Sequence, residues 1–144
     1  MGDCADYVNG FIERKKNGTY QGSLTIDGVN LEGGIEATYF KDDGKDYVWL
    51  KRRPCLEYDT KTNSYKTRKR EPQWEVYLQK QVDNNIIAYK GTFTFFHFRY
   101  SIIGIWDRIL GKETQRLNLY VERLPMNQQT ILHGINERKR NEHK

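Results

Sequence analysis

Two clusters of cations, separated by a short polar stretch and interleaved with aromatic rings, are the residues of this chain best suited to bind a ligand. Lys51-Arg52-Arg53 forms the first cluster and Lys66-Thr67-Arg68-Lys69-Arg70 forms the second. If the segments between them pair as an antiparallel hairpin, the clusters lie side by side, and like charges held together repel unless an anion lies across them. Tyr58, Tyr65 and Trp74 stand beside these cations, which combines phosphate contacts with base stacking, as single-stranded nucleic acid requires.

A further aromatic segment, KGTFTFFHFRY from Lys90 to Tyr100, carries five rings in eleven residues. In a strand, Phe93 and Phe95 share one face and Phe96 and Phe98 share the other, so the phase shifts between Phe95 and Phe96. The sequence therefore predicts either a β-bulge at that point or rings on both faces. It leaves open whether these rings fill the core or form an exposed platform.

The run from Phe93 to Phe98 resembles the aromatic signature of RNA-recognition-motif domains, in which a basic residue and a glycine precede alternating aromatics on a central strand. Here Lys90-Gly91 is followed by an additional Thr92, and Thr94 occupies the position of a Gly or Ala. The chain also lacks the two strand–helix–strand units of that fold, so we do not assign it to the family. The likeness implies the same physics on another scaffold: flat rings on a sheet stack unpaired bases, and nearby cations hold phosphates.

These features predict a non-enzymatic protein that binds nucleic acid, in single-stranded form, through a basic hairpin and aromatic side chains. About six phosphate contacts would make the affinity fall steeply with salt. The candidate binding residues are Lys51, Arg52, Arg53, Tyr58, Tyr65, Lys66, Arg68, Lys69, Arg70, Trp74, Phe96 and Phe98.

The same residues allow other interpretations. The basic segment can be a solvated edge that discourages aggregation between sheets. A protein-interaction module, such as an adaptor or an inhibitor encoded by a phage or a mobile element, would use the same charge against an acidic protein surface. A third alternative is a closed barrel that holds one small ligand. The mostly large interior side chains argue against it, because they would fill a small barrel themselves.

Catalytic and metal-binding patterns are weak. Cys55 could act as a nucleophile only if the fold brought His97 or His133 against it, and no motif indicates such a contact. Glu57 and Asp59 would share a face of a strand and could hold a divalent cation, but spacing places no third ligand. We therefore expect no enzyme activity, no metal and no cofactor.

The charge of the chain is polarised. The net charge is +5, yet residues 1–50 contain 5 Lys and Arg against 9 Asp and Glu, whereas residues 51–70 contain 8 against 2. This asymmetry predicts a basic region that attracts polyanions or an acidic partner, and an acidic region that repels them.

Length and composition indicate one domain without covalent staples. A chain of 144 residues can bury roughly two thirds of its unfolded surface. Two cysteines cannot form a multi-bridge framework, so a reducing compartment is the simpler expectation. No signal-peptide pattern and no apolar run of about twenty residues occurs, which favours a cytoplasmic protein without membrane contact.

The elements that must position the candidate residues are mostly short strands. Apolar and polar residues alternate at residues 20–26, 35–39, 74–78 and 117–121, and residues 47–50 form an apolar run that completes a hairpin with residues 39–40. Turn residues such as Asp27-Gly28 and Asp43-Gly44 separate these runs. The pattern predicts a mainly β, β-rich α+β fold: a curved antiparallel sheet or small barrel of about 7–8 strands with short N-terminal and C-terminal helices.

The helices are expected at the chain ends. Helical spacing of apolar residues predicts a short helix over about residues 4–16 and another from Asn127 onward. Residues 102–110 fit a helix and a strand equally well. We expect a single globular domain over 1–136 and a basic, disordered tail over 137–144.

Overall fold

The computed structural model describes residues 8–53, 56–67, 74–109 and 112–129, and these residues are mostly strand. A single helical turn occupies residues 126–129. The strands are β1 (Gly10–Arg14), β2 (Tyr20–Ile26), β3 (Val29–Asn30), β4 (Ile35–Asp42), β5 (Lys45–Arg52), β6 (Leu56–Asp59), β7 (Ser64–Thr67), β8 (Glu75–Asp83), β9 (Ile86–Phe95), β10 (Phe98–Ile109) and β11 (Lys112–Arg123).

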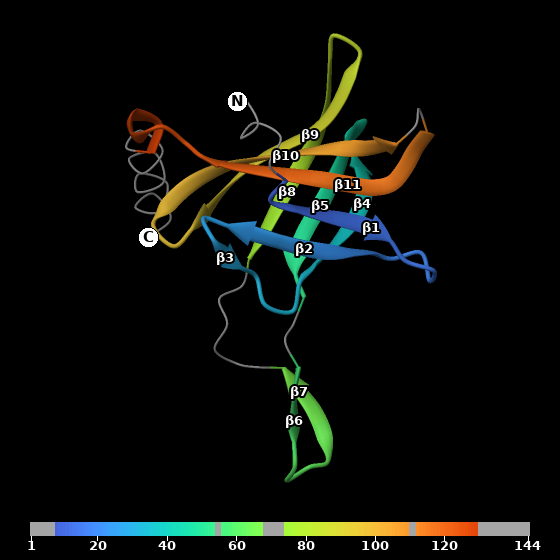
Figure 1. Ribbon diagram of the computed structural model, residues 1–144, viewed down its shortest axis with the longest axis vertical. Coiled ribbons are helices and arrows are strands. Elements are labelled where there is room, and N and C mark those ends of the chain that lie inside the picture. The colour runs from blue at the N-terminus through green and yellow to red at the C-terminus, as the bar shows by residue number, and fades with distance from the viewer. Residues whose placement is uncertain (1–7, 54–55, 68–73, 110–111, 130–144) are drawn as a thin grey trace.

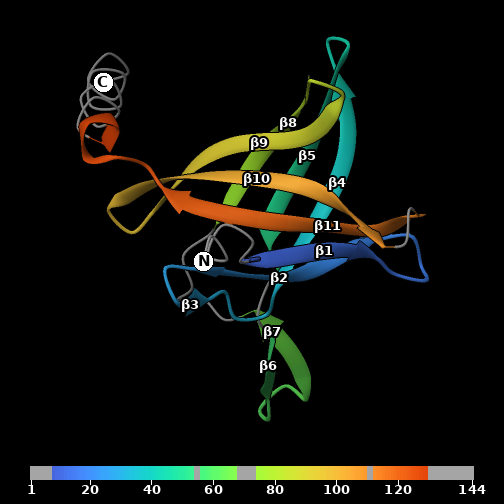
Figure 2. The same cartoon turned by 45° about the horizontal axis from the view of Figure 1, so that its top comes forward.

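Eight of these strands form a closed antiparallel β-barrel. Figures 1 and 2 show how the sheet curves round on itself. The order around the wall is β1-β2-β4-β5-β8-β9-β10-β11, and β1 closes the barrel because it pairs with both β2 and β11. Apart from β11 and β1, strands that are neighbours in the wall therefore follow one another in the chain. The connection is a turn in most cases, β3 between β2 and β4, and β6 with β7 between β5 and β8. The prediction of an antiparallel barrel of about 7–8 strands is confirmed.

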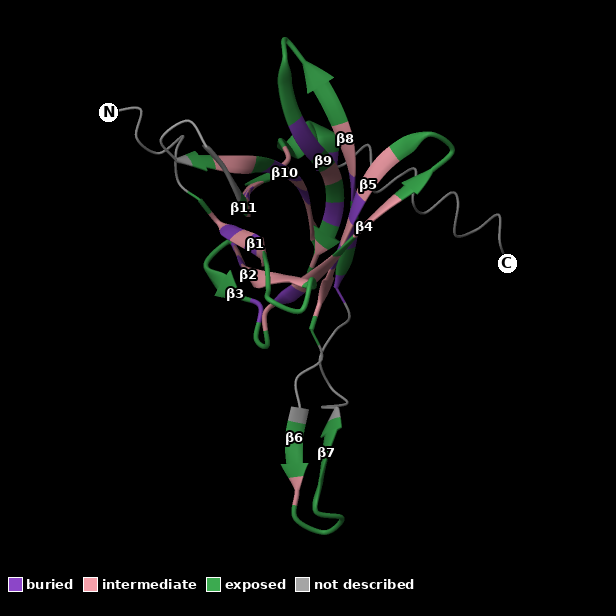
Figure 3. Cartoon of the chain, turned by 90° about the vertical axis from the view of Figure 1, so that its right-hand side faces the viewer, coloured by how far each residue is buried: buried purple, intermediate pink, exposed green. Residues whose placement is uncertain are grey.

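The core lies inside the barrel, where the two-residue period of each strand places its aliphatic side chains. In β5, for example, Val48 and Leu50 are fully buried, while Trp49 between them faces outward. The largest fully buried side chains come from nearly every wall strand: Ile12, Leu24, Ile26, Ile35, Val48, Leu50, Leu78, Ile102, Leu117 and Leu119. Side chains therefore fill the middle of the barrel, and Figure 3 shows the exposed residues gathered at its extremities and on the hairpins.

Gly22 allows the wall to close tightly beside β1. A Cβ atom at this position would lie 1.7 Å from the carbonyl oxygen of Phe11 on β1. Only glycine permits this approach of two backbones, which is a common reason for a glycine at a barrel corner.

The N-terminal part of the chain corrects one expectation. Residues 10–14 form β1 and not a helix, because Ile12 faces the core between β2 and β11, and the ladder with both neighbours satisfies the backbone. Residues 102–109 belong to β10, with Ile102 facing the core and Ile105 facing outward. Among the described residues, no helix has the length and apolar character needed to cross a membrane. The expected tail over 137–144 and its boundary lie outside the described residues.

The aromatic segment is a hairpin and not one strand. β9 ends at Phe95, residues 96 and 97 make the turn, and β10 begins at Phe98, so the phase shift comes from a turn and from neither of the two expected alternatives, a bulge or rings on both faces of one strand. Phe96 has a φ of 57°, which places a bulky residue in the left-handed region. Phe93 is buried in the core and Phe96 is 68% exposed.

Strands β6 and β7 form a separate two-stranded sheet between β5 and β8 in the chain. This hairpin projects away from the barrel, on the side opposite the β8–β9 hairpin (Figures 1 and 3). The expectation of a hairpin in this polar segment is confirmed. No ladder joins it to the described strands of the barrel.

Candidate nucleic-acid interface

The outward face of β5 carries cations and rings in one row. Val48 and Leu50 face the core, so the alternate positions Lys45, Tyr47, Trp49 and Lys51 face outward, and the exposed Arg53 follows directly after the strand. Side chains on one face of a strand recur about every 6.8 Å. The row therefore offers a cation, two rings and two further cations along a single line.

Rings from the neighbouring strands widen this row into a surface. The rings of Trp49 and Tyr77 are stacked, with centroids 5.7 Å apart and planes 6° apart. Phe40 stacks on Tyr47 at 5.3 Å and meets the edge of Tyr77 at 6.0 Å. We call Phe40, Tyr47, Trp49 and Tyr77 the outer aromatic platform. Tyr77 exposes half of its surface, so at least one ring is freely accessible to a ligand.

Charged side chains contact the Trp49 ring at the border of the platform. The Lys51 ammonium lies 4.6 Å from the centre of the Trp49 ring and 3.3 Å from a Glu36 carboxylate oxygen. Trp49 Nε1 donates a hydrogen bond of 3.3 Å to Glu75. The Lys51–Glu36 pair is partly exposed, and such pairs contribute at most about 1 kcal/mol, so Lys51 can exchange Glu36 for another anion at little cost.

The two arginines after Lys51 differ in their surroundings. Arg52 has inward-facing register at the end of the barrel, opposite Ile35, and its Nε donates to the carbonyl oxygen of Glu32 at 3.2 Å. Arg53 is exposed, and its backbone N–H donates to the carbonyl of Gly34 at 2.9 Å, which fixes the chain where it leaves the barrel. Of these two side chains, that of Arg53 is better placed to meet a phosphate.

The β6–β7 hairpin presents two exposed rings. Tyr58 and Tyr65 lie opposite each other in the ladder, are 53% and 69% exposed, and make an edge contact at 5.3 Å. Lys66 pairs with Asp59 at 2.8 Å. The hydrogen bond from Lys66 and a second from the backbone N–H of Lys61 hold the pKa of Asp59 below its usual range.

Trp74 corrects the predicted set of stacking residues. It directly precedes β8, shares the inward face with Val76 and Leu78, and exposes 6% of its surface. Its ring packs edge-on against Phe93 at 5.3 Å, so neither face is open to a base. Arg68, Lys69 and Arg70 lie outside the described residues.

Phe96 and Phe98 belong to a different surface, at the β9–β10 turn. Phe96 is exposed and touches Phe95 at 4.6 Å, whereas Phe98 is partly buried beneath the Arg123 guanidinium, 3.9 Å from its ring centre. These rings are not continuous with the outer aromatic platform through any ring contact between described residues.

The described residues do not assemble the catalytic or metal-binding sites that were weighed from the sequence. Cys55 and His133 lie outside the described residues, and His97 is exposed in the β9–β10 turn. The Asp59 carboxylate is engaged by Lys66. No group of three or more His, Cys, Asp or Glu side chains within the described part of the chain is arranged to hold a metal ion.

The outer aromatic platform was missed in the sequence, although a signal was present. In Tyr47-Val48-Trp49-Leu50 the aliphatic residues alternate with the aromatic ones, and the aromatic phase is the phase of Lys45, Lys51 and Arg53.

Comparison of this chain with protein-family models, with curated proteins and with solved structures finds no match.

Proposed function

We propose that this protein binds single-stranded nucleic acid, without catalysis, along the outward face of β5 and onto the β6–β7 hairpin. The observation that carries the proposal is the row of Lys45, Tyr47, Trp49, Lys51 and Arg53, which alternates with core residues on one strand. Aromatic rings beside a line of cations form the usual binding surface for unpaired bases.

In this proposal the rings and the cations have separate tasks. Tyr77 and Trp49 stack bases, a contact worth about 1–3 kcal/mol for each base. Lys51 and Arg53 meet phosphates, with Lys51 released from Glu36. Because every base has a flat face and every nucleotide a phosphate, the binding would depend little on sequence.

The hairpin extends the same path. β5 leads from the platform toward β6, and the exposed Tyr58 and Tyr65 offer further stacking surfaces. Lys66 would add a phosphate contact, and Arg68, Lys69 and Arg70 retain the same proposed role on the basis of their sequence.

The two cysteines without a paired motif support a reducing, cytoplasmic setting.

Salt dependence tests the proposal. We would measure the anisotropy of a labelled short oligothymidylate and of an oligouridylate with the native protein, at about 50 mM and 200 mM salt. The native protein should bind at low salt and weaken steeply. In the Lys51→Ala/Arg53→Ala variant the slope of log K against log salt should be less steep by about 1.4, since each lost contact on a single strand contributes about 0.7. Tyr77→Ala should weaken binding by about 1–3 kcal/mol.

Lys16→Ala is the matched control, because Lys16 is an exposed cation in the β1–β2 turn, away from the platform. It should leave both affinity and slope unchanged. Absence of binding at low salt would overturn the proposal and would favour the competing reading, in which the rings and cations meet an acidic protein surface. Tyrosine, tryptophan and arginine are also the residues enriched at protein interfaces.

A further inference from the structure

The barrel wall is split at the end opposite the β6–β7 hairpin. The β9–β10 ladder stops at Tyr89 and Gly104, yet β9 remains paired with β8 as far as Ile86, and β10 remains paired with β11 as far as Ile109. Residues 86–88 and 105–109 therefore part from one another while each keeps its other neighbour. A cavity of about 260 Å³ occupies this split.

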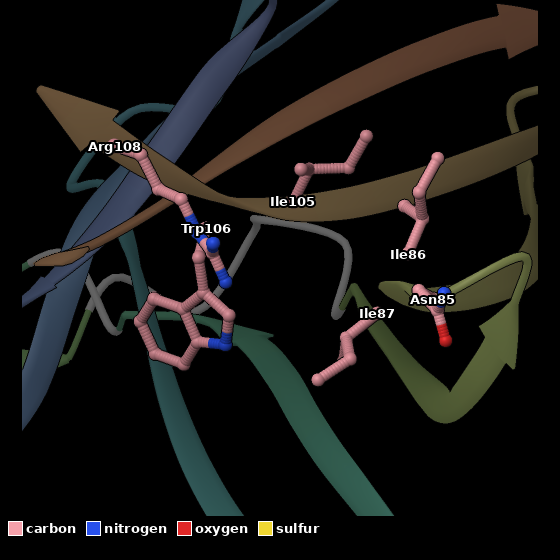
Figure 4. Close-up of a pocket in the computed structure, with 6 residues that line it drawn as sticks. All are labelled: Asn85, Ile86, Ile87, Ile105, Trp106 and Arg108. Atoms are coloured by element: carbon pink, nitrogen blue, oxygen red, sulfur yellow. The ribbon is translucent and has the colours of Figure 1, made fainter. Parts of the chain in front are cut away.

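The cavity is mostly apolar on the β9 side and mixed on the β10 side. Figure 4 shows Asn85, Ile86 and Ile87 on one side and Ile105, Trp106 and Arg108 on the other. Ile86 is 60% exposed, and Ile87 and Ile105 are also exposed. Three isoleucines open to solvent around one cavity form a surface that gains stability when an apolar group covers it.

Trp106 connects the cavity to a layer of rings inside the barrel. Its ring lies parallel to that of Tyr39 at 6.0 Å, and Tyr20 and Tyr89 pack against Tyr39 in turn. The Tyr39 hydroxyl is buried and has no hydrogen-bond partner among the described residues. Burial, followed by the neighbouring Tyr89 and Tyr20, raises the pKa of Tyr39, so this hydroxyl keeps its proton and remains a donor.

Cations outnumber carboxylates among the described inward-facing side chains at the same end of the barrel. Arg108 lines the cavity, and the inward-facing positions at this end include Arg14, Lys41 and Lys80. Asp46 is the carboxylate among the described inward-facing side chains there, and it is shared by Lys41 at 3.6 Å and Lys80 at 3.8 Å. A ligand that enters the split therefore meets apolar groups, a tryptophan and the Arg108 side chain.

We propose that the split between β9 and β10 binds a small organic anion, with its apolar body against the isoleucines and Trp106 and its anionic group at Arg108. The cavity is near the lower limit of ordinary small-molecule sites, about 300 Å³, so the ligand is a short chain or a single ring. This site is separate from the outer aromatic platform, and it does not depend on nucleic-acid binding.

A series of probes that differ only in charge tests this site. Octanoate, octanamide and octylammonium would be titrated into the isotope-labelled native protein, with inorganic phosphate as an anion without an apolar body. We expect octanoate to bind about tenfold more tightly than octanamide, and to exceed octylammonium by a still larger factor, because a charge-assisted hydrogen bond is stronger than a neutral one. The backbone signals of Ile86, Ile87 and Ile105 and the Trp106 indole signal should shift.

Arg108→Gln should reduce the affinity for octanoate about tenfold and leave that for octanamide unchanged. The matched control is Lys90→Gln, which removes an exposed cation from the outward face of β9. Three results would overturn the proposal: equal affinity for octanoate and octanamide, binding of phosphate as tight as that of octanoate, or shifts confined to residues away from the split. Oligonucleotide binding by Arg108→Gln should equal that of the native protein, so the two proposals fail separately.

Discussion

Trp49 and Trp74 sit on adjacent parts of the wall but have opposite environments. Trp49 faces outward on β5 among tyrosines and Lys51, whereas Trp74 faces inward and packs on Phe93. The phase of the strand decides this, because a shift of one residue moves a side chain to the other face of the sheet. At the scale of single residues, whether a ring faces the core or the outside therefore follows from the residues two positions away, which share its face of the strand.

A hydrogen-bonded cluster at the β2–β3 turn links three distant parts of the chain. The Tyr100 hydroxyl donates to Asp27 at 2.5 Å, and the Arg123 guanidinium donates to the same carboxylate oxygen at 2.5 Å. The bond from Tyr100, then that from Arg123, holds the pKa of Asp27 below its ordinary value. Asp27 therefore stabilises the fold in its ionised form.

Asp27→Asn should lower stability at neutral pH by about 1 kcal/mol or less, since the carboxylate is partly exposed and an asparagine oxygen still accepts from Tyr100. Because the folded pKa is depressed, the contribution is complete above the unfolded pKa of about 3.9 and is lost as pH falls through the lower, folded value. Urea denaturation across this range should show the native protein and the variant converging in acid.

Asp43→Asn is the control for this variant. Asp43 also precedes a glycine in a turn and also has a positive φ, 51° against 48° for Asp27. The two substitutions therefore match in backbone effect, and only the first removes a negative charge that accepts from Tyr100 and Arg123. A pH-independent difference between native protein and Asp27→Asn would contradict the assigned role of the carboxylate.

At the scale of elements, the strands with strict alternation were predictable and the hairpin turns were only partly so. β2 and β8 show one apolar face, and Asp27-Gly28 and Asp43-Gly44 are residues that adopt positive φ readily. The turn at residues 96 and 97 has no such residues, since a phenylalanine takes the left-handed conformation there. Tertiary pairing of β9 with β10 imposes that turn, and local sequence does not reveal it.

The helix expected over about residues 4–16 was wrong for a related reason, since residues 10–14 form β1. Its apolar residues fit a helical period and a strand period equally over so few positions, and the ladder with β2 and β11 decides between them. The outward role of Tyr47 and Trp49 could have been inferred from alternation. The split between β9 and β10 could not, because it depends on where a ladder between distant residues stops.

The β6–β7 hairpin should be dispensable for folding and required for full affinity. We would replace residues 56–67 by a short Gly-Ser linker. The urea midpoint should change little, because no ladder ties this hairpin to the described strands of the barrel. Affinity for the oligothymidylate should fall by at least the value of one stacked base, about 1–3 kcal/mol, because Tyr58 and Tyr65 are removed.

Tyr58→Ala/Tyr65→Ala, which keeps the hairpin, separates the loss of rings from the loss of the element. It should reproduce most of the decrease in affinity. Unchanged binding by the linker variant would remove the hairpin from the interface, and unfolding of that variant would show that the barrel depends on it.

At the scale of the whole molecule, the closed barrel serves as a rigid support for two surfaces. Its interior is filled by aliphatic and aromatic side chains, so ligands are left with the outside of the wall and the end where β9 and β10 part. The outer aromatic platform and its cations lie on β4, β5 and β8, and the apolar cavity lies between β9 and β10. The charge asymmetry of the sequence is consistent with this division, since the cations after Trp49 gather where β5 leaves the barrel.

The indole N–H signal of Trp49 gives the most direct test of the central claim. Assigned by comparison with Trp49→Phe, it should shift and saturate when a short oligothymidylate is added at low salt, together with the backbone signals of Tyr47, Lys51 and Tyr77. The indole signals of Trp74, in the core, and Trp106, at the split, should stay in place. An unmoved Trp49 signal in the presence of bound oligonucleotide, or no binding at low salt, would contradict the assignment of nucleic-acid binding to this face.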